Sequence, residues 1–188
     1  MKFSETPIPG LMQIFPEVFE DQRGQFVEIW HKDYYAHLPG LSALFQSQTT
    51  TYIDWKTDCL AIAHRGVLKG LHGDWKNWKL IDCIQGRIFT VIADLRTTGD
   101  TYGETFTTVL TSRTHNQLLI PPGCATGTQC LSDECVLHYK QSEFYDGGDK
   151  QFTVNYKDET LDIDWPIKIG AIISERDRKG ERFIDIRP

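Results

Sequence analysis

The sequence predicts an all-β protein, and three observations carry that prediction. Short segments rich in β-branched and aromatic residues recur along the chain, separated by turns rich in Gly, Pro, Asp and Asn. Helical periodicity is weak. The segment 86–95 is apolar at nearly every position, which is typical of an inner strand covered on both faces. Many short strands in one chain favour a β-sandwich or a β-barrel.

The expected elements follow from residue type and from the turns between them. Turn sequences such as DQRG, HGD, TTGDTYG, PPG and YDGGD separate segments in which Val, Ile, Thr, Phe and Tyr are frequent. Residues 31–38 and the tail after Trp165 are expected to form short helices. The expected strands are residues 25–30, 59–64, 86–95, 104–112, 116–120, 135–140 and 151–156.

Length, charge and cysteine usage limit the class of protein. The 188 residues, 40% of them hydrophobic, fit one domain over 1–188. A net charge of −6 argues against general nucleic-acid binding. Five cysteines without a CxxC pair indicate reduced, mostly buried thiols. Because we find no signal-peptide pattern and no run of about 18 apolar residues, we expect a cytoplasmic protein without a membrane span.

A spaced motif between residues 66 and 86 narrows the fold. The first motif of a cupin-type jelly roll is Gly, five residues, His-x-His, three or four residues, Glu, six residues and Gly. This chain has Gly66, His72, Lys79 and Gly86 at that spacing, with Asp74 at the position of the second histidine. The spacing therefore predicts a cupin-type jelly roll with a few short helices.

The metal ligands of the cupin motifs are largely missing. The second motif contains Pro-x-Gly-x-x-His, and this chain has PPGCAT at 121–126, with Thr126 at the histidine position. Lys79 stands where the first motif has glutamate and would repel a divalent cation. His72 and Asp74 alone are too few ligands. We therefore expect no metal in this scaffold.

Several stretches, taken in order, match one family over nearly the whole chain. The sequence resembles the dTDP-4-dehydrorhamnose 3,5-epimerases and related nucleotide-sugar epimerases. The resemblance implies a cofactor-free homodimer, domain-swapped through its N-terminal strand, that acts on 4-keto-6-deoxy sugars linked to a nucleoside diphosphate. The matching stretches are FEDQRGQFVE (19–28), GVLKGLH (66–72), ADLR (93–96), TYGE (101–104), NQLLIPPG (116–123), LHYKQSEFY (137–145), LDIDWP (161–166) and SERD (174–177).

The resemblance also implies roles for individual residues. His72 is the expected base, Asp177 its partner, and Tyr139 the proton donor across the sugar ring. Lys79 matches the lysine near the C4 oxygen. The residues expected to bind the substrate are Arg23, Glu28, Lys69, Gln117 and Arg176.

These residue types suit epimerisation next to a ketone. The C4 ketone acidifies the protons on C3 and C5, and removal of one proton gives an enolate. Inversion then needs a base on one side, an acid on the other and a positive group at the oxyanion. A histidine suits the base because its ordinary pKa is about 6.5. A carboxylate behind the histidine fixes the tautomer and stabilises the imidazolium.

The chain departs from the family pattern at three positions that bear on the substrate. The family usually has His-Tyr-Gln at the catalytic histidine, whereas this chain has HGD at 72–74. It usually has Ala-His-Gly after the proline turn, where this chain has Thr126. Lys69 replaces an arginine and loses bidentate phosphate geometry. The substrate could therefore carry dTDP or GDP on a hexose or a heptose, with C3, C5 or both inverted.

Alternatives remain open on the sequence alone. A nucleotide-sugar 3,4-ketoisomerase, a non-catalytic sugar-binding cupin and a metal-dependent cupin dioxygenase could use the same scaffold. Asp158 rivals Asp177 as the partner of the histidine. Trp75 and Trp78 could stack on a base or pack in the core, and we expect at least one to pack.

Overall fold

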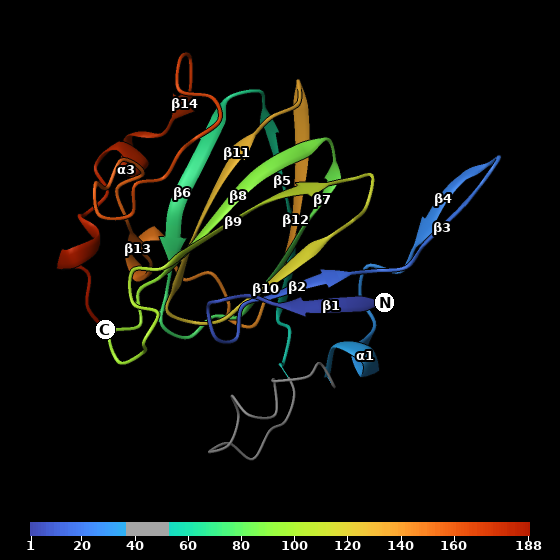
Figure 1. The fold of residues 1–188 in the computed structure, drawn as a ribbon, viewed down its shortest axis with the longest axis horizontal. Helices are drawn as coiled ribbons and strands as arrows, with labels where there is room; N and C mark the ends of the chain where they lie inside the picture. The colour runs from blue at the N-terminus through green and yellow to red at the C-terminus, as the bar shows by residue number, and fades with distance from the viewer. Residues whose placement is uncertain (37–52) are drawn as a thin grey trace.

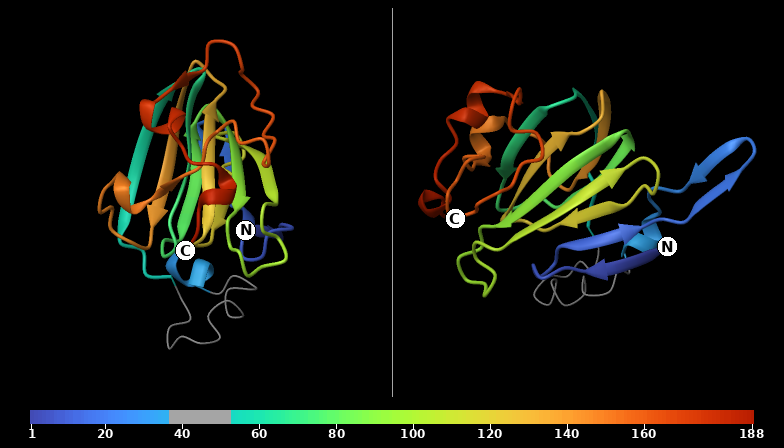
Figure 2. Two further views of the ribbon diagram at one scale, coloured as in Figure 1. Left: turned by 90° about the vertical axis from the view of Figure 1, so that its left-hand side faces the viewer. Right: turned by 45° about the horizontal axis from the view of Figure 1, so that its top comes forward.

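Two facing, mainly antiparallel sheets form the body of the protein. A computed structural model describes residues 1–36 and 53–188. The two layers and the cover formed by the C-terminal segment are visible in Figures 1 and 2. The first sheet has the strand order β1 (Lys2–Glu5), β2 (Met12–Phe15), β10 (Gln117–Ile120), β7 (Lys79–Gln85), β12 (Glu134–Gln141) and β5 (Thr57–His64).

The second sheet faces the first and carries two short additional strands at its edge. Its order is β13 (Phe152–Thr153), β6 (Val67–Gly73), β11 (Cys124–Cys130), β8 (Arg87–Asp94) and β9 (Thr105–Thr111), and β14 (Ile172–Ile173) pairs with β6 in parallel. The separate hairpin of β3 (Val18–Asp21) and β4 (Gly24–Val27) projects away from the two sheets (Figure 1). This arrangement is the predicted all-β, cupin-like jelly roll.

Helices are few and short. The helix α1 covers Lys32–Ala36 and α3 covers Glu175–Arg178, while single 3-10 turns lie at Gly148–Lys150 and Phe183–Asp185. The expected helix at 31–38 is thus confirmed in its first part, and residues 37–38 lie outside the described residues. The short helix expected after Trp165 is α3.

The strand predictions succeed best in the inner strands. Residues 86–95 contain β8, which lies between β11 and β9 and is buried at most positions, as the unbroken apolar run predicted. Two expectations were too long, because the strand within 25–30 ends at Val27 and that within 151–156 covers only Phe152–Thr153. The expected segments did not include β1, β2, β3, β6, β7, β11 or β14.

Three clusters of buried side chains hold the layers together. The first lies between the sheets and includes Ile81, Ile92 and Leu118. In the second, the C-terminal segment packs on the outer face of the second sheet through Trp165 and Phe183. The third lies on the outer face of the first sheet, beneath α1. Because apolar burial contributes about 25 cal/mol per Å², these clusters fix the strands that line the interior.

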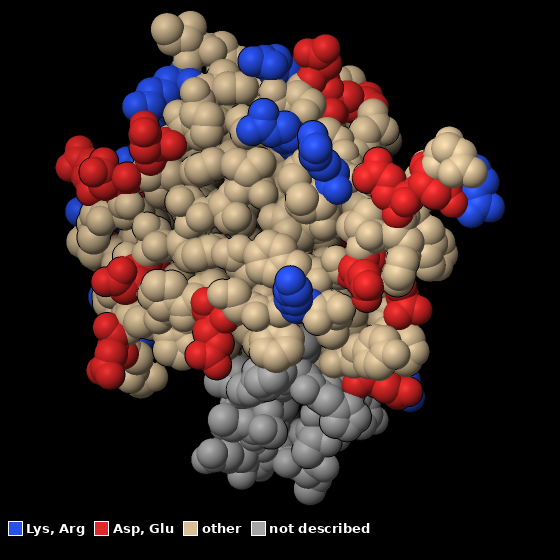
Figure 3. All heavy atoms as spheres, turned by 45° about the vertical axis from the view of Figure 1, so that its right-hand side comes forward, with Lys and Arg blue, Asp and Glu red and all other residues tan. Residues whose placement is uncertain are grey.

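The cysteines and the surface charges are those of an ordinary globular protein. The five cysteines are free thiols, four of them buried, as predicted. On the face shown in Figure 3, Lys and Arg side chains stand singly or in small groups, and acidic side chains lie near its margins. Within residues 1–36 and 53–188, no helix is long and apolar enough to cross a membrane.

Candidate active site

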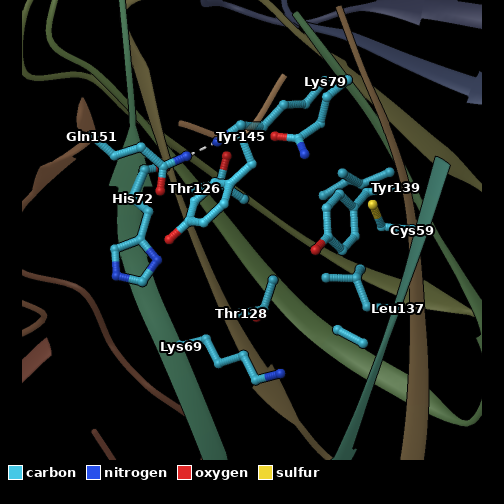
Figure 4. Close-up of a pocket in the computed structure, with 13 residues that line it drawn as sticks. Cys59, Lys69, His72, Lys79, Thr126, Thr128, Leu137, Tyr139, Tyr145 and Gln151 are labelled. Carbon is cyan, nitrogen blue, oxygen red and sulfur yellow. Dashed lines mark hydrogen bonds between the residues drawn. The ribbon is translucent and has the colours of Figure 1, made fainter. Parts of the chain in front are cut away.

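A cavity of about 380 Å³ opens between the two sheets. Strands β5, β7 and β12 form one wall, and β6 and β11 form the other. Figure 4 shows His72 and Tyr139 on opposite walls, with Lys69 and Lys79 toward different ends of the cavity. Four side chains expected at the site thus come together from three strands. The complete lining is Cys59, Ala61, Lys69, His72, Lys79, Ile81, Thr126, Thr128, Leu137, Tyr139, Gln141, Tyr145 and Gln151.

His72 is held by Asp177, which lies 105 residues later in the chain. The distance from His72 Nε2 to Asp177 Oδ1 is 2.6 Å, and the Asp177 side chain is only 3% exposed. The short helix α3 positions the carboxylate, because the Ser174 hydroxyl caps α3 by accepting from the Asp177 N–H. Burial opposes ionisation of Asp177, but hydrogen bonds from His72, Ser174 and the Gly70 N–H outweigh it and lower its pKa.

The pairing determines which ring nitrogen of His72 is available. An ionised carboxylate only accepts hydrogen bonds, so Nε2 of His72 carries the hydrogen that points to Asp177. In the neutral ring, Nδ1 is then the unprotonated nitrogen. Figure 4 shows this nitrogen on the side of the ring that faces the cavity. A base located at Nδ1 therefore meets the space where a ligand fits.

Tyr139 faces His72 from β12. Its register partner on β5 is Cys59, and the Cys59 thiol is also a hydrogen-bond partner of the Tyr139 side chain. Burial raises the pKa of Tyr139, and the neighbouring Cys59 adds to the shift. A tyrosine with a raised pKa keeps its hydrogen at neutral pH. The hydroxyl can therefore act as a proton donor toward the cavity.

Lys79 is a partly buried cation at the start of β7. Its Nζ lies 3.5 Å from the backbone carbonyl oxygen of His72, so the ammonium lies close to the His72 backbone. Burial lowers the pKa of Lys79, and the nearby Arg176 acts in the same direction, whereas Asp74 opposes the shift. A positive group at this place can stabilise negative charge that develops on a ligand oxygen.

The other positions of the metal motifs have structural explanations. Asp74 shapes the turn after β6, because its Oδ1 accepts from the N–H groups of Lys76 at 2.9 Å and Asn77 at 2.6 Å. Gly73 is required by packing, since an added Cβ would lie 2.4 Å from the Cys124 carbonyl oxygen. Among the described residues, no three His, Cys, Asp or Glu groups gather as metal ligands would.

Two further basic residues lie at or near the cavity. Lys69, on β6, lines it directly, and its side chain makes no hydrogen bond or ion pair with any described residue. Arg176, on α3, is bound by its neighbours: Nε donates to Thr153 Oγ1 and Nη2 donates to the Gly148 carbonyl, each at 3.0 Å. Lys79 and Arg176 thus lie close enough to interact electrostatically, whereas Lys69 brings a positive charge to the other end of the cavity.

Gln117 lies away from the cavity of its own chain, on the outer face of the first sheet. Leu118 and Ile120 of β10 point into the core between the sheets, so Gln117 points to the outer face. It is 1% exposed, and both amide ends are used: Oε1 accepts from the Tyr35 hydroxyl at 2.6 Å and Nε2 donates to the Ile29 carbonyl at 2.7 Å. Gln117 therefore anchors the chain around α1 and does not reach the cavity.

Arg23 and Glu28 do not reach the cavity of their own chain. Arg23 lies at the tip of the β3–β4 hairpin, is 83% exposed and pairs with Asp21 at 2.6 Å. Glu28 follows β4 and is exposed. The hairpin also exposes Phe19 by 56% and Phe26 by 68%. These residues would need a second molecule to contact a ligand in this type of cavity.

The structure also shows the surroundings of Asp158, the alternative partner for His72, and of Trp75 and Trp78. Asp158 accepts from three backbone N–H groups, those of Thr160, Leu161 and Phe183, so it is a structural residue rather than the partner of His72. Trp78 packs against the third core cluster, which confirms that at least one tryptophan packs. Trp75 contacts Phe152, with ring centroids 5.0 Å apart, and lines a second cavity.

The second cavity adjoins the first and was not predicted. It measures about 360 Å³ and shares Gln141, Tyr145 and Gln151 with the first cavity. Tyr145 and Gln141 lie within the stretch 137–145 that carried the family resemblance, but only Tyr139 was singled out there. The rest of the lining is Asp74, Trp75, Lys76, Asn77, Glu143, Phe144, Asp146, Gly147 and Lys150.

Fold and site together define a class: a jelly-roll enzyme with a His–Asp pair, a tyrosine and a lysine around one cavity. The sequence profile of dTDP-4-dehydrorhamnose 3,5-epimerases matches residues 5–185. The chain belongs to this family of isomerases.

Individual relatives agree along nearly the whole chain. The dTDP-4-dehydrorhamnose 3,5-epimerase of Methanothermobacter thermautotrophicus is 36% identical over 94% of this chain and 91% of its own length. The dTDP-6-deoxy-D-glucose-3,5-epimerase of Legionella pneumophila, solved with dTDP-4-keto-L-rhamnose, superposes with a TM-score of 0.88 at 28% identity, covering 99% and 94% of the two chains. The enzyme of Elizabethkingia anophelis gives 0.82 at 32% identity, covering 98% and 97%.

Proposed function

We propose that this protein is a cofactor-independent epimerase that inverts C3, C5 or both in a nucleoside-diphosphate-linked 4-keto-6-deoxy sugar. The sugar is a hexose or a heptose on dTDP or GDP, and the product feeds deoxysugar and polysaccharide biosynthesis. The single observation that carries the proposal is the cavity itself, where His72 and Tyr139 face each other and Lys79 lies beside His72. The complex of the Legionella pneumophila relative supports dTDP-linked sugars as the first substrates to test.

Proton removal starts the proposed reaction. Nδ1 of His72 takes the hydrogen from the carbon next to the C4 ketone, and Asp177 stabilises the imidazolium through Nε2–H. The electron pair of the broken C–H bond forms a carbon–carbon double bond, and the carbonyl electrons move onto the C4 oxygen. The Lys79 ammonium then holds the negative oxygen of this enolate.

Proton return completes the inversion. Tyr139 donates its hydroxyl hydrogen to the same carbon from the face opposite His72, and the carbonyl re-forms as the double-bond electrons take up that proton. The tyrosinate regains a proton from water, and His72 releases its proton to water. No oxidant or reductant is consumed, so the sequence of steps balances without a cofactor.

The rest of the substrate would extend from the reaction cavity into the second one. Tyr145 borders both cavities, and Trp75 and Phe144 offer further aromatic faces on which a base can stack. Lys76 and Lys150 provide positive charge there. Arg176, which interacts with Lys79, supplies a further cation for the diphosphate, and Lys69 supplies positive charge at the other end of the reaction cavity.

The proposed active form is a homodimer in which each hairpin reaches the cavity of the other subunit. This would bring Arg23 and Glu28 to a ligand and cover Phe19 and Phe26, which are exposed in the single chain. Subunit mixing tests it with His72→Asn and Arg23→Ala, each expected to be inactive alone. Mixed dimers would restore about a quarter of wild-type activity, because half of the dimers are mixed and each has one intact site. No recovery after complete subunit exchange would contradict the shared site.

The decisive experiment is proton NMR of dTDP- and GDP-linked 4-keto-6-deoxy sugars incubated with the protein in D₂O. Deuterium incorporation at C3, C5 or both, together with inversion, is expected and identifies the centres and the preferred nucleotide. The His72→Asn variant should retain substrate binding and lose exchange. Migration of the carbonyl would instead identify a 3,4-ketoisomerase. Binding without exchange would leave a sugar-binding protein, and stoichiometric iron with oxygen consumption would indicate a dioxygenase.

A further inference from the structure

The side chain of Gln141 lies where the reaction cavity meets the second cavity. Gln141 lines both cavities and is otherwise buried. It is two residues from Tyr139 on the inner face of β12, and its register partner on β7 is Lys79. A ligand that extends from the reaction cavity into the second cavity therefore passes this amide.

The orientation of the Gln141 amide is fixed by Asn77. The Asn77 carbonyl oxygen Oδ1 accepts from the backbone N–H groups of Ser142 at 3.0 Å and Glu143 at 3.2 Å. Nδ2 is therefore the donor end of Asn77, and it donates to Gln141 Oε1 at 2.8 Å. Because the carbonyl oxygen of Gln141 is occupied in this way, the amino end of its amide, Nε2, is left for other partners.

Nε2 of Gln141 has donor capacity that the protein does not use fully. An amide nitrogen carries two N–H groups. Nε2 donates to the Thr57 hydroxyl at 3.5 Å, which is longer than the roughly 2.7–3.2 Å of an ordinary N–H···O bond. Thr57 and Lys79 flank Gln141 in one row across the sheet. The wall at the junction thus combines an amide donor with a neighbouring cation.

Hydrogen-bond donors at this junction suit a diphosphate. The ionised phosphate oxygens of a nucleotide sugar accept hydrogen bonds, and such charge-assisted bonds are stronger than those between neutral groups. The diphosphate is also the part of the molecule between the sugar and the nucleoside. It occupies the junction when the sugar fills the reaction cavity and the nucleoside fills the second cavity.

We propose that Gln141 Nε2 donates a hydrogen bond to the phosphate bonded to the sugar, and that Asn77 is the positioning residue that keeps this donor toward the ligand. This inference rests on the proposed function and adds a specific phosphate contact to it. Because the phosphate keeps its charge during the reaction, Gln141 acts equally on substrate and transition state. Its removal therefore raises KM and leaves kcat nearly unchanged.

Matched variants separate this role from packing. Gln141→Met keeps the length of the side chain and removes the amide. Gln141→Glu keeps an acceptor for Asn77 and replaces the donor by a second acceptor. Gln129→Met is the control, because Gln129 is a buried glutamine of β11 that pairs with the Ile167 backbone and lines neither cavity. Thermal unfolding of each variant measures retention of the fold.

The first measurement is the affinity for dTDP and dTMP, and for GDP and GMP, by isothermal titration calorimetry. A monophosphate lacks the phosphate that would be bonded to the sugar. We expect Gln141→Met to weaken diphosphate binding about 10- to 100-fold and monophosphate binding less than about threefold. Gln141→Glu should weaken diphosphate binding at least as much as Gln141→Met. In the deuterium-exchange assay, KM of Gln141→Met should rise by a similar factor, and Gln129→Met should match wild type throughout.

Asn77→Asp tests the orientation of the amide. An aspartate at this position still accepts from the Ser142 and Glu143 N–H groups, but its second oxygen needs a donor, so the Gln141 amide turns over and presents its carbonyl oxygen to the ligand. The loss of diphosphate affinity should be larger in the wild-type background than in Gln141→Met, which has no amide to turn. Equal losses in the two backgrounds would overturn the positioning role of Asn77.

Specific results would overturn the phosphate contact. Wild-type affinity for diphosphates in folded Gln141→Met, an equal loss for monophosphates, or a loss confined to kcat would each do so. An equal loss in Gln129→Met would show a general effect of replacing buried glutamines. If wild-type protein neither bound a nucleoside diphosphate nor exchanged substrate hydrogen, the proposed function itself would fail. Failure of the Gln141 contact alone leaves the wild type active.

Discussion

Replacing Asp177 with asparagine should slow proton removal about a thousandfold. The 2.6 Å contact with Nε2 puts the carboxylate directly behind the base, and the side chain is 3% exposed. When His72 becomes an imidazolium, the two charge centres are about 4 Å apart, and at an effective dielectric constant of about 20 they attract by about 4 kcal/mol. Because about 1.4 kcal/mol corresponds to a factor of ten, Asp177→Asn removes about three orders of magnitude.

The assay is deuterium incorporation by Asp177→Asn compared with wild type, at equal amounts of folded protein. Asp158→Asn provides the matched control, because it removes the charge of the rival carboxylate that only binds backbone N–H groups. That control should lower thermal stability while retaining kcat. Exchange by Asp177→Asn within tenfold of wild type would refute the electrostatic reasoning, as would an equally large loss of kcat in the control.

Other predictions concern the acid, an accessible thiol and a buried histidine. The Tyr139→Phe variant should still exchange substrate hydrogen through His72, but its rate of inversion should fall at least about 100-fold. Deuterium incorporation into the substrate and formation of the inverted product are measured separately. Equal losses in the two rates would argue against a proton-donor role for Tyr139. Iodoacetamide should modify Cys59 first in the native protein, because Cys59 lines the cavity whereas the other four cysteines are buried. Mass spectrometry of protein labelled with and without dTDP measures the order of modification. Faster labelling of a buried cysteine would contradict the prediction. His138 donates a hydrogen bond from Nδ1 to Asp82 Oδ1 at 2.7 Å, which raises the pKa of His138, and Asp58 adds to the shift. A raised pKa in the folded state contributes stability that is fully present below the unfolded value of about 6.5 and is lost as pH rises through the folded value. Urea unfolding at pH 6 and pH 9 should therefore show wild type losing more stability than His138→Gln, and parallel losses would rule out this source.

Strands were predicted correctly from the sequence where the segment consists mainly of apolar or β-branched residues. The apolar run of β8, the β-branched run of β9 and the Val-Leu and Tyr residues of β12 were recognised because such residues favour a pleated, buried surface. The strand β11 was missed because CATGTQC contains small residues and a glycine, which carry little β-propensity. The shortest strands, β13 and β14, depend on pairing with β6, which local sequence cannot report.

The site was predicted mainly through family resemblance, and its errors have a geometric cause. Every position of β10 is buried, so the alternation of faces leaves no polar signal and Gln117 could not be assigned to the outer face. The pairing of His72 with Asp177 spans 105 residues, which no local pattern encodes. The role of Asp158 in holding backbone N–H groups was equally invisible before the fold was known.

Because Asp177 lies near the end of the chain, the His72–Asp177 pair can form only after the C-terminal segment has folded onto the sheets. Every strand of both sheets precedes Asp177 in the chain, whereas α3 docks only after the segment beyond Trp165 has crossed the outer face of β6. During synthesis, the strands can associate before the base acquires its partner. A nascent or proteolytically nicked molecule would thus have both sheets formed, but His72 would lack Asp177 and the apolar outer face of the second sheet would be exposed. We therefore expect activity to appear only when the segment after Trp165 covers this apolar face and brings Asp177 to His72.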